Sequence, residues 1–94
     1  MKTEALVRNA VNSMRARDLD AAEKYAHALL ENEPENPKAH ILYGNIKLKK
    51  DDYRGALASY KQSLKLDSHN AEAFNNIGVL YRQRGDLANG LKAM

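Results

Sequence analysis

The amino-acid sequence predicts an all-α fold made of antiparallel helix hairpins, and three observations support this prediction. Apolar and small residues recur at steps of three and four, as they do when one stripe of a helix is buried. The sequence overlays itself at a fixed offset that aligns Ala5, Ala39 and Ala73, which indicates a repeated unit. Only two to four residues separate the periodic segments, so neighbouring helices must pack antiparallel.

Six helices are expected along the chain, two in each repeat. The expected helices span residues 3–16, 19–32, 37–50, 53–66, 71–84 and 87–94. In each repeat an Asp stands just before the second helix and can cap it by accepting bonds from its free N–H groups; these are Asp18, Asp52 and Asp86. Asn36 followed by Pro37 predicts an N-cap with proline at the first helical position, and Asn70 takes the same place without proline.

Small residues recur in phase at two places in the repeat. Midway along the first helices stand Ala10, Gly44 and Gly78, and early in the second helices stand Ala22, Ala56 and Gly90. A larger side chain at either place would push two antiparallel helices apart. The recurrence therefore predicts that the two helices of each hairpin approach closely.

Composition limits the function classes that remain. The chain has 94 residues, of which 44% are hydrophobic and 29% charged, and this suits a single domain spanning 1–94. The formal net charge of +3 is weak and interspersed, which argues against nucleic acid as the partner. There is no cysteine to form a disulfide or a thiolate metal site, and no apolar run approaches a membrane span. No secretion signal is recognised, so a cytoplasmic location is expected.

The repeated residues resemble the tetratricopeptide repeat (TPR) family, whose pattern is W-x2-L-G-x2-Y, A-x3-F and P on a period of 34. The second repeat supplies His40, Tyr43, Gly44, Lys47, Ala56, Tyr60 and Ser68 at those places. The third supplies Phe74, Ile77, Gly78, Tyr81, Gly90 and Met94, and the first supplies Leu6, Asn9, Ala10, Ser13, Ala22, Ala26 and Pro34. The resemblance implies a right-handed superhelical solenoid with repeats at 3–36, 37–70 and 71–94, about two and a half in all.

The third repeat is incomplete, because a full one would extend past Met94. Repeat arrays normally finish with a polar-faced capping helix, and here Leu87, Leu91 and Met94 would be left uncovered. Two alternatives follow. The chain is a piece of a longer array, or a second chain covers the open end and gives a homo-oligomer.

The resemblance also implies that a peptide lies on the concave face, which the first helix of each repeat lines. The residues expected to contact it are Val7, Val11, Ile41, Asn45, Leu48, Lys49, Asn75, Val79 and Arg82. Val7, Val11, Ile41 and Leu48 would form an exposed apolar strip of the kind that marks a partner site. The alternative for these four side chains is packing between adjacent repeats.

One groove type in the family binds the C-terminal carboxylate of chaperones through Lys, Asn and Arg side chains. The matching places hold Val7, Val11, Leu42, Glu72 and Asn76 here, so none of the five agrees. A shifted arrangement of Asn45, Asn76 and Lys49 is conceivable but lacks the paired cations that hold a carboxylate. We therefore do not expect a chaperone-tail clamp.

No pattern in the sequence indicates catalysis. His27, His40 and His69 share no metal-ligand spacing, and His40 is expected to be a packed histidine. There is no Gly-rich phosphate loop and no nucleophile grouping of known form, so neither an enzyme nor a cofactor is predicted. Cations near the ends of the first helices, such as Lys47, Lys49 and Lys50, are expected to be solvated there or to attract an acidic peptide.

Three hypotheses about function follow. The first is a scaffold that holds a protein or peptide partner in its concave groove, and the sequence does not name that partner. The second is a structural element that self-associates through its uncapped C-terminal helix. The third is an accessory segment of a larger multidomain protein whose chemistry lies elsewhere.

Overall fold

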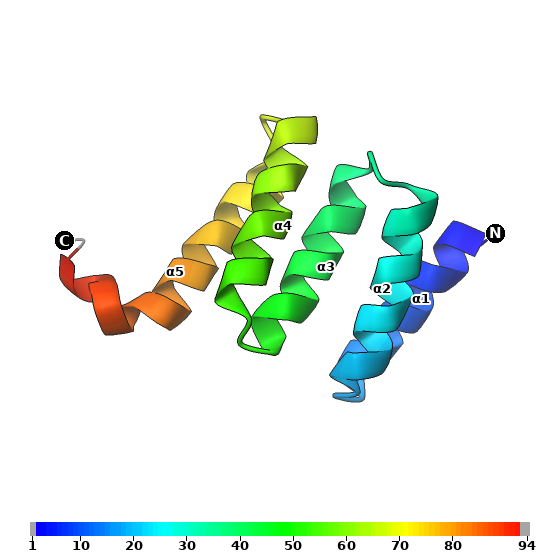
Figure 1. Ribbon diagram of the computed structural model, residues 1–94, viewed down its shortest axis with the longest axis horizontal. Helices are drawn as coiled ribbons and strands as arrows, with labels where there is room; N and C mark the ends of the chain where they lie inside the picture. The colour runs from blue at the N-terminus through cyan, green and yellow to red at the C-terminus, as the bar shows by residue number, and fades with distance from the viewer. Residues whose placement is uncertain (1, 93–94) are drawn as a thin grey trace.

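The computed structural model describes the backbone of residues 2–92 and the side chains of residues 2–84. The described backbone consists of helices and short turns, which confirms the predicted all-α fold. The helices are α1 (Lys2–Arg15), α2 (Leu19–Asn32), α3 (Pro37–Lys49), α4 (Tyr53–Leu66) and α5 (Ala71–Lys92). They follow one another in chain order as a repeat solenoid, with α1 at one end and α5 at the other (Figure 1). In residues 2–92, no helix combines the length and apolarity needed to cross a bilayer.

The turns inside the first two hairpins are alike and confirm the predicted caps. Asp18 accepts a hydrogen bond from the backbone N–H of Ala21, and Asp52 accepts one from that of Gly55. Each capping Asp follows a residue in the left-handed region, with φ of 63° at both Arg17 and Asp51. This conformation reverses the chain within two residues and brings the second helix back along the first.

The turns between repeats are also closed by side chains. Asn36 Oδ1 accepts a hydrogen bond from the N–H of Lys38 at 2.9 Å, with Pro37 opening α3 as predicted. Asn70 Oδ1 accepts one from the N–H of Ala73 at 3.1 Å. Both asparagines therefore satisfy a backbone donor that a helix start would otherwise leave without a partner.

In the first two repeats the small residues lie where α1 meets α2 and where α3 meets α4, whereas Gly78 is exposed on α5. Ala10, Ala22 and Ala56 are fully buried, and Gly44 is buried beside Tyr60. A Cβ added at Gly44 would lie 2.7 Å from Cε1 of Tyr60, closer than side-chain carbons approach one another. Gly44 is therefore required by the tyrosine ring that α4 places against it.

Two apolar clusters hold the array together. The larger joins α3, α4 and α5 and contains Ile41, Leu48, Ala56, Tyr60, Ala73 and Leu80. The smaller joins α2 to α3 and contains Ala22, Ala26 and Ile46, with Met14, Leu42 and Tyr43 packed against it. The second repeat therefore contributes to both clusters and contacts both of its sequence neighbours.

The expected break at Gly85–Asp86 is wrong. Instead of two helices over 71–84 and 87–94, one continuous helix runs from Ala71 to Lys92. An isolated helix of eight residues is unstable, because short helices do not repay the cost of nucleation. Continuing α5 lets each backbone N–H bond to the carbonyl four residues earlier without closing a turn. The side chains of Leu87 and Leu91, and Met94 as a whole, lie outside the described residues.

Candidate functional site

A hollow of about 610 Å³ opens between the ends of the first helices of the three repeats. Helices α1, α3 and α5 line it, together with the start of α2 and the turns that contain Arg17 and Asp51. The lining residues are Met14, Arg17, Leu19, Asn45, Leu48, Lys49, Asp51, Asn76, Val79 and Gln83. Its volume is within the range of pockets that bind small ligands or a few residues of a peptide.

Four of the nine expected groove residues line this hollow, namely Asn45, Leu48, Lys49 and Val79. The exposed apolar strip expected from the sequence is wrong in part. Ile41 is only 2% exposed and packs in the core cluster with Ala73 and Leu80, so it offers no surface to a partner. Leu48 is 8% exposed and contributes to both the core and the floor of the hollow.

The other four expected residues lie elsewhere on the surface. Val7 is 38% exposed on α1, and Val11 is half-buried on the same helix. Asn75 and Arg82 are exposed on α5. None of these four lines the hollow, so the structure brings together only part of the predicted set.

Asn45 is the central polar side chain of the hollow. Its Oδ1 accepts a hydrogen bond from the Tyr60 hydroxyl at 2.5 Å and another from Nδ2 of Asn76 at 3.0 Å. Tyr60 is fully buried, and burial, assisted by the charge of Glu72, raises the pKa of its hydroxyl to about 12. The phenol therefore stays protonated at neutral pH and keeps donating, which fixes the orientation of the Asn45 amide.

This arrangement leaves one amide donor and one amide acceptor next to each other. Both recorded bonds of Asn45 end on Oδ1, so among the described residues no acceptor takes the N–H groups of its Nδ2. Likewise no described residue donates to Oδ1 of Asn76. A peptide bond offers the complementary pair, a carbonyl that accepts and an N–H that donates.

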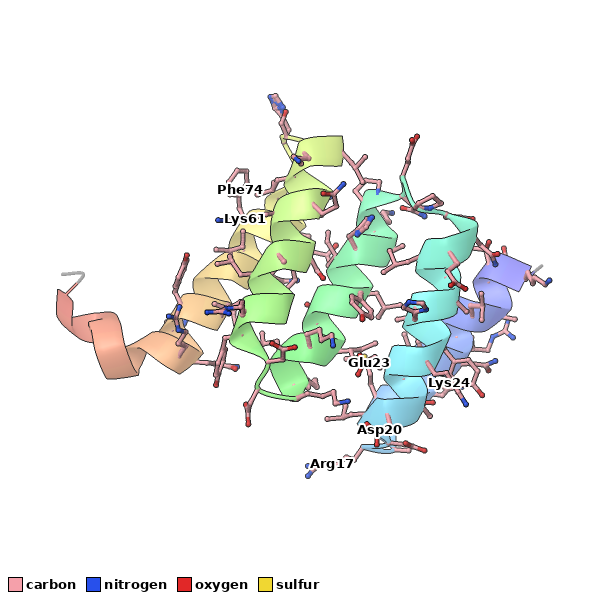
Figure 2. The ribbon with its side chains drawn as sticks, in the orientation of Figure 1. Arg17, Asp20, Glu23, Lys24, Lys61 and Phe74 are labelled. Carbon is pink, nitrogen blue, oxygen red and sulfur yellow. The ribbon has the colours of Figure 1, made fainter. Side chains whose placement is uncertain are left out.

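Charged residues stand at the edge of the hollow. Arg17 extends outward from the α1–α2 turn (Figure 2), Lys49 is exposed at the end of α3, and Asp51 lies on the next turn. These three side chains carry a net charge of +1 at neutral pH. Leu19, Leu48 and Val79 supply the apolar part of the lining.

Sequence reasoning missed the contribution of the turns. Arg17, Leu19 and Asp51 line the hollow although they stand outside the first helices. The available signal was the pair of matched turns, since Arg17 and Asp51 occupy the same place in consecutive repeats. Asn45, Asn76 and Lys49 were considered together as a carboxylate site, and the structure does place all three in one hollow.

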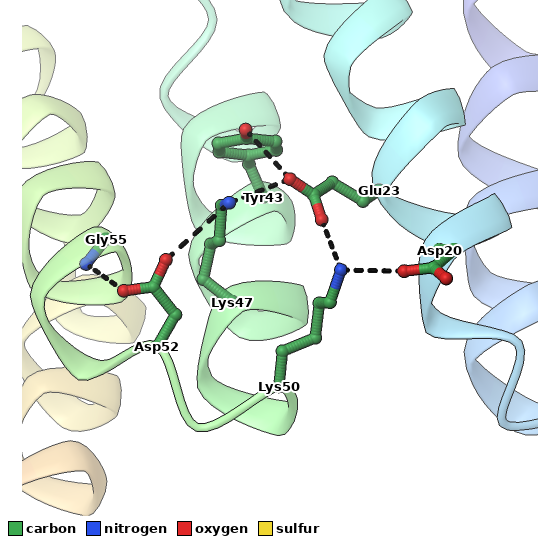
Figure 3. Close-up of polar contacts among 7 residues, drawn as sticks. All are labelled: Asp20, Glu23, Tyr43, Lys47, Lys50, Asp52 and Gly55. Atoms are coloured by element: carbon green, nitrogen blue, oxygen red, sulfur yellow. Dashed lines mark hydrogen bonds and ion pairs between the residues drawn. The ribbon is translucent and has the colours of Figure 1, made fainter.

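A second polar cluster joins repeat one to repeat two and lies outside the hollow (Figure 3). The Glu23 carboxylate on α2 contacts the Nζ atoms of Lys47 and Lys50, each at 2.7 Å. Lys50 also reaches Asp20 at 2.8 Å, and Lys47 lies 3.6 Å from the carboxylate of Asp52. Two of the cations expected to be solvated or to attract an acidic peptide are thus paired within the fold.

These contacts shift the pKa values of the groups involved. Hydrogen bonds from Lys47 and then Lys50 lower the pKa of Glu23 to about 2. The bond to Glu23 raises the pKa of Lys47, and the bonds to Asp20 and Glu23 raise that of Lys50. All three groups remain charged at neutral pH, so the ion pairs join α2 to α3.

The histidines are not arranged as metal ligands. His40 donates from Nε2 to the carbonyl of Pro34 at 2.8 Å and is satisfied within the fold, as expected. Within the described part of the chain, no three His, Cys, Asp or Glu side chains come close enough to hold a metal ion.

Comparisons with known proteins agree with this architecture. Residues 8–48 match the tetratricopeptide repeat family and residues 44–85 match the TPR repeat. The Photosystem I assembly protein Ycf3 of Rippkaea orientalis (strain PCC 8801 / RF-1) is 37% identical over 71 residues, which are 73% of this chain. The chain spans 41% of the length of that relative.

A solved structure shows the same fold at low sequence identity. The TPR2B domain of yeast Sti1, in a complex described as TPR2B-domain:pHsp70, superposes with a TM-score of 0.82 at 16% identity. The match covers 88% of this chain and 66% of that one. The repeat period, the packed hairpins, the two family matches and this superposition lead to one conclusion: the chain belongs to the tetratricopeptide repeat family.

Proposed function

We propose that this chain is a non-catalytic interaction module that binds an extended protein segment in the hollow between α1, α3 and α5. The observation that carries the proposal is the amide pair of Asn45 and Asn76. Asn45 Nδ2 would donate to a peptide carbonyl, and Asn76 Oδ1 would accept from the neighbouring peptide N–H. Because Tyr60 holds Asn45 from the buried side, the pair is oriented before the ligand arrives, which lowers the entropic cost of binding.

The charges at the edge favour a ligand with an acidic side chain. Lys49 and Arg17 lie on the rim and outnumber Asp51, so a carboxylate on the bound segment would meet net positive charge. The apolar lining from Leu48 and Val79 would accept an adjacent aliphatic side chain. The preferred ligand is therefore an extended segment with an acidic and an apolar residue close together.

The chaperone-tail mode is not part of this proposal. The family places that hold a terminal carboxylate carry Val7, Val11, Leu42 and Glu72, which supply no cation and one anion. Likeness to the Sti1 domain concerns the fold alone. The Rippkaea orientalis relative is named an assembly protein, and this name supports a function in protein interaction of the general class proposed here.

A peptide library displayed on phage provides the probe for this proposal. Peptides selected on the intact chain are synthesised, and their affinities are measured by fluorescence anisotropy. Asn76→Ala should weaken binding by about fivefold or more, because one hydrogen bond to the peptide is lost while Asn45 keeps its bond to Tyr60. Asn75→Ala is the matched control, since Asn75 is exposed one residue away and does not line the hollow.

Two outcomes would contradict the proposal. If Asn75→Ala weakened the selected peptides and Asn76→Ala did not, the contact surface would lie on the exposed side of α5. If Lys49→Ala left the affinity for acidic peptides and the salt dependence of that affinity unchanged, Lys49 would play no part in selecting them. Lys65→Ala on α4 is the control, and we expect it to change neither the affinity nor its salt dependence.

A further inference from the structure

Helix α5 exposes two large apolar side chains with a glycine between them. Phe74 is 57% exposed and Tyr81 is 45% exposed, and Gly78 between them is exposed as well. Their spacing of four and three residues places them on one side of the helix. Exposed large apolar side chains grouped in this way mark an interaction surface.

The same place is buried in the earlier repeats. Ala10 and Gly44, which hold the place of Gly78 in the first and second repeats, are both buried. At Gly44 the covering group is Tyr60 of the following helix, 2.7 Å from where a Cβ would lie. At Gly78 no atom of the described side chains comes within 4 Å of that point. Among the described residues, no helix covers this surface of α5 in the way that α4 covers Gly44 on α3.

The chain contains residues that correspond to those of the covering helix α4, but they lie on α5 itself and do not cover its surface. Leu87, Gly90 and Leu91 stand one repeat period after Tyr53, Ala56 and Leu57 of α4, which all pack in the larger core cluster. In a continuous helix, Leu87 lies about 14 Å further along the axis than Gly78. The last turns of α5 extend past the other helices and cannot fold onto their own earlier turns (Figure 1).

We propose that two copies of this chain exchange the segment beginning at Leu87. In this dimer the extended end of each α5 lies across Gly78 and Tyr81 of the other copy, with Phe74 at the edge of the contact. It takes the place that α4 takes on α3. The exchange is reciprocal, so it closes as a two-fold dimer. A segment of the same sequence supplies the residue types that the repeat requires there, which is why a second copy is the occupant.

The molar mass in solution tests the proposal directly. Sedimentation equilibrium of the 94-residue chain over a wide concentration range should show a monomer–dimer equilibrium. Phe74→Gln combined with Tyr81→Gln should raise the dimer dissociation constant by about tenfold or more, since Tyr81 faces the exchanged segment and Phe74 lies at its edge. Val7→Gln, which removes another exposed apolar side chain at the far end of the array, should not change it. A chain that stays monomeric, or a dimer that resists the double substitution, would overturn the proposal.

Disulfide cross-linking distinguishes segment exchange from other dimers. Because the chain has no cysteine, every disulfide must join cysteines introduced by substitution. Met94 holds the place in the third repeat that Tyr60 holds in the second, so Gly78→Cys in one copy should form a disulfide with Met94→Cys in another when the two variants are mixed. A disulfide between two copies of the Gly78→Cys variant would indicate face-to-face packing of two α5 helices. A disulfide within one chain carrying both substitutions would show that the segment folds back on itself. Either result would refute the exchange.

Discussion

Gly44 and Gly78 occupy the same place in consecutive repeats, and the structure predicts opposite effects for the same substitution. In a helix, alanine is favoured over glycine by about 1 kcal/mol. Gly78→Ala should retain this full gain because the added methyl group meets no described atom within 4 Å. We expect the midpoint of thermal unfolding to rise by about 4–8 °C for a domain of this size.

Gly44→Ala should destabilise the fold despite the same helix preference. The added Cβ would lie 2.7 Å and 2.9 Å from Cε1 and Cδ1 of Tyr60, whose ring is fully buried and has no free space to enter. Overpacking of this kind costs about 1–3 kcal/mol. A displaced ring would also weaken its bond to Asn45, worth about 1 kcal/mol. After subtracting the helix gain, the net loss is about 1–3 kcal/mol.

Urea unfolding followed by circular dichroism measures both variants against the parent chain. Low protein concentration keeps the α5 surface free of any second copy. The reasoning fails if the two substitutions change the unfolding free energy by the same amount, because the contact of Gly44 with Tyr60 would then have no energetic consequence. The reasoning also fails if Gly44→Ala raises the free energy of unfolding.

Three further predictions follow from individual contacts. Because the pKa of Glu23 is lowered to about 2, its ion pairs stabilise the fold above pH 4.5, and this stabilisation is lost as the pH falls from 4.5 toward 2. Glu23→Gln should therefore lower the free energy of unfolding by about 1–2 kcal/mol at pH 7 and by little at pH 2. Urea titrations at the two pH values would show this difference. Ser63 is fully buried and its hydroxyl finds no partner in the described structure, so Ser63→Ala should leave stability unchanged or raise it by up to about 1 kcal/mol, and a loss comparable to a broken hydrogen bond would disagree. Asp52→Ala should cost about 1 kcal/mol because it removes the cap on α4, whereas Asp86→Ala should cost nothing because α5 has no helix start there; equal losses in thermal unfolding would favour a turn at Gly85–Asp86.

Most helix boundaries could be predicted because local chemistry determines them. The caps at Asp18, Asp52 and Asn36 are one-residue effects, and each recurs or is reinforced within the period. The end of α4 and the start of α5 followed from the same reasoning. The break at Gly85–Asp86 carries similar local signals, yet α5 continues through it. A turn is stable only when the helix that follows finds a surface to pack on, and that depends on tertiary contacts that local signals do not report.

The candidate site was predicted in part for a related reason. Ile41 and Asn45 lie one turn apart on α3, so periodicity assigns them to the same side of the helix. The angle at which α5 packs then places Ile41 against Ala73 and Leu80, and leaves Asn45 beside the hollow. Interhelical angles depend on how complete side chains interlock, which spacing alone does not determine. The hydrogen bonds among Asn45, Tyr60 and Asn76 depend on the same geometry.

The two joints of the array differ in chemistry, and this has a mechanical consequence. Between α2 and α3 the contact combines a small apolar cluster with ion pairs of Glu23, whereas between α4 and α5 it is mainly apolar. Added salt screens the partly exposed ion pairs and strengthens contacts between apolar surfaces. Added salt should therefore make the joint between the first and second repeats weaker relative to the joint between the second and third, so bending of the array in high salt is expected to concentrate between α2 and α3.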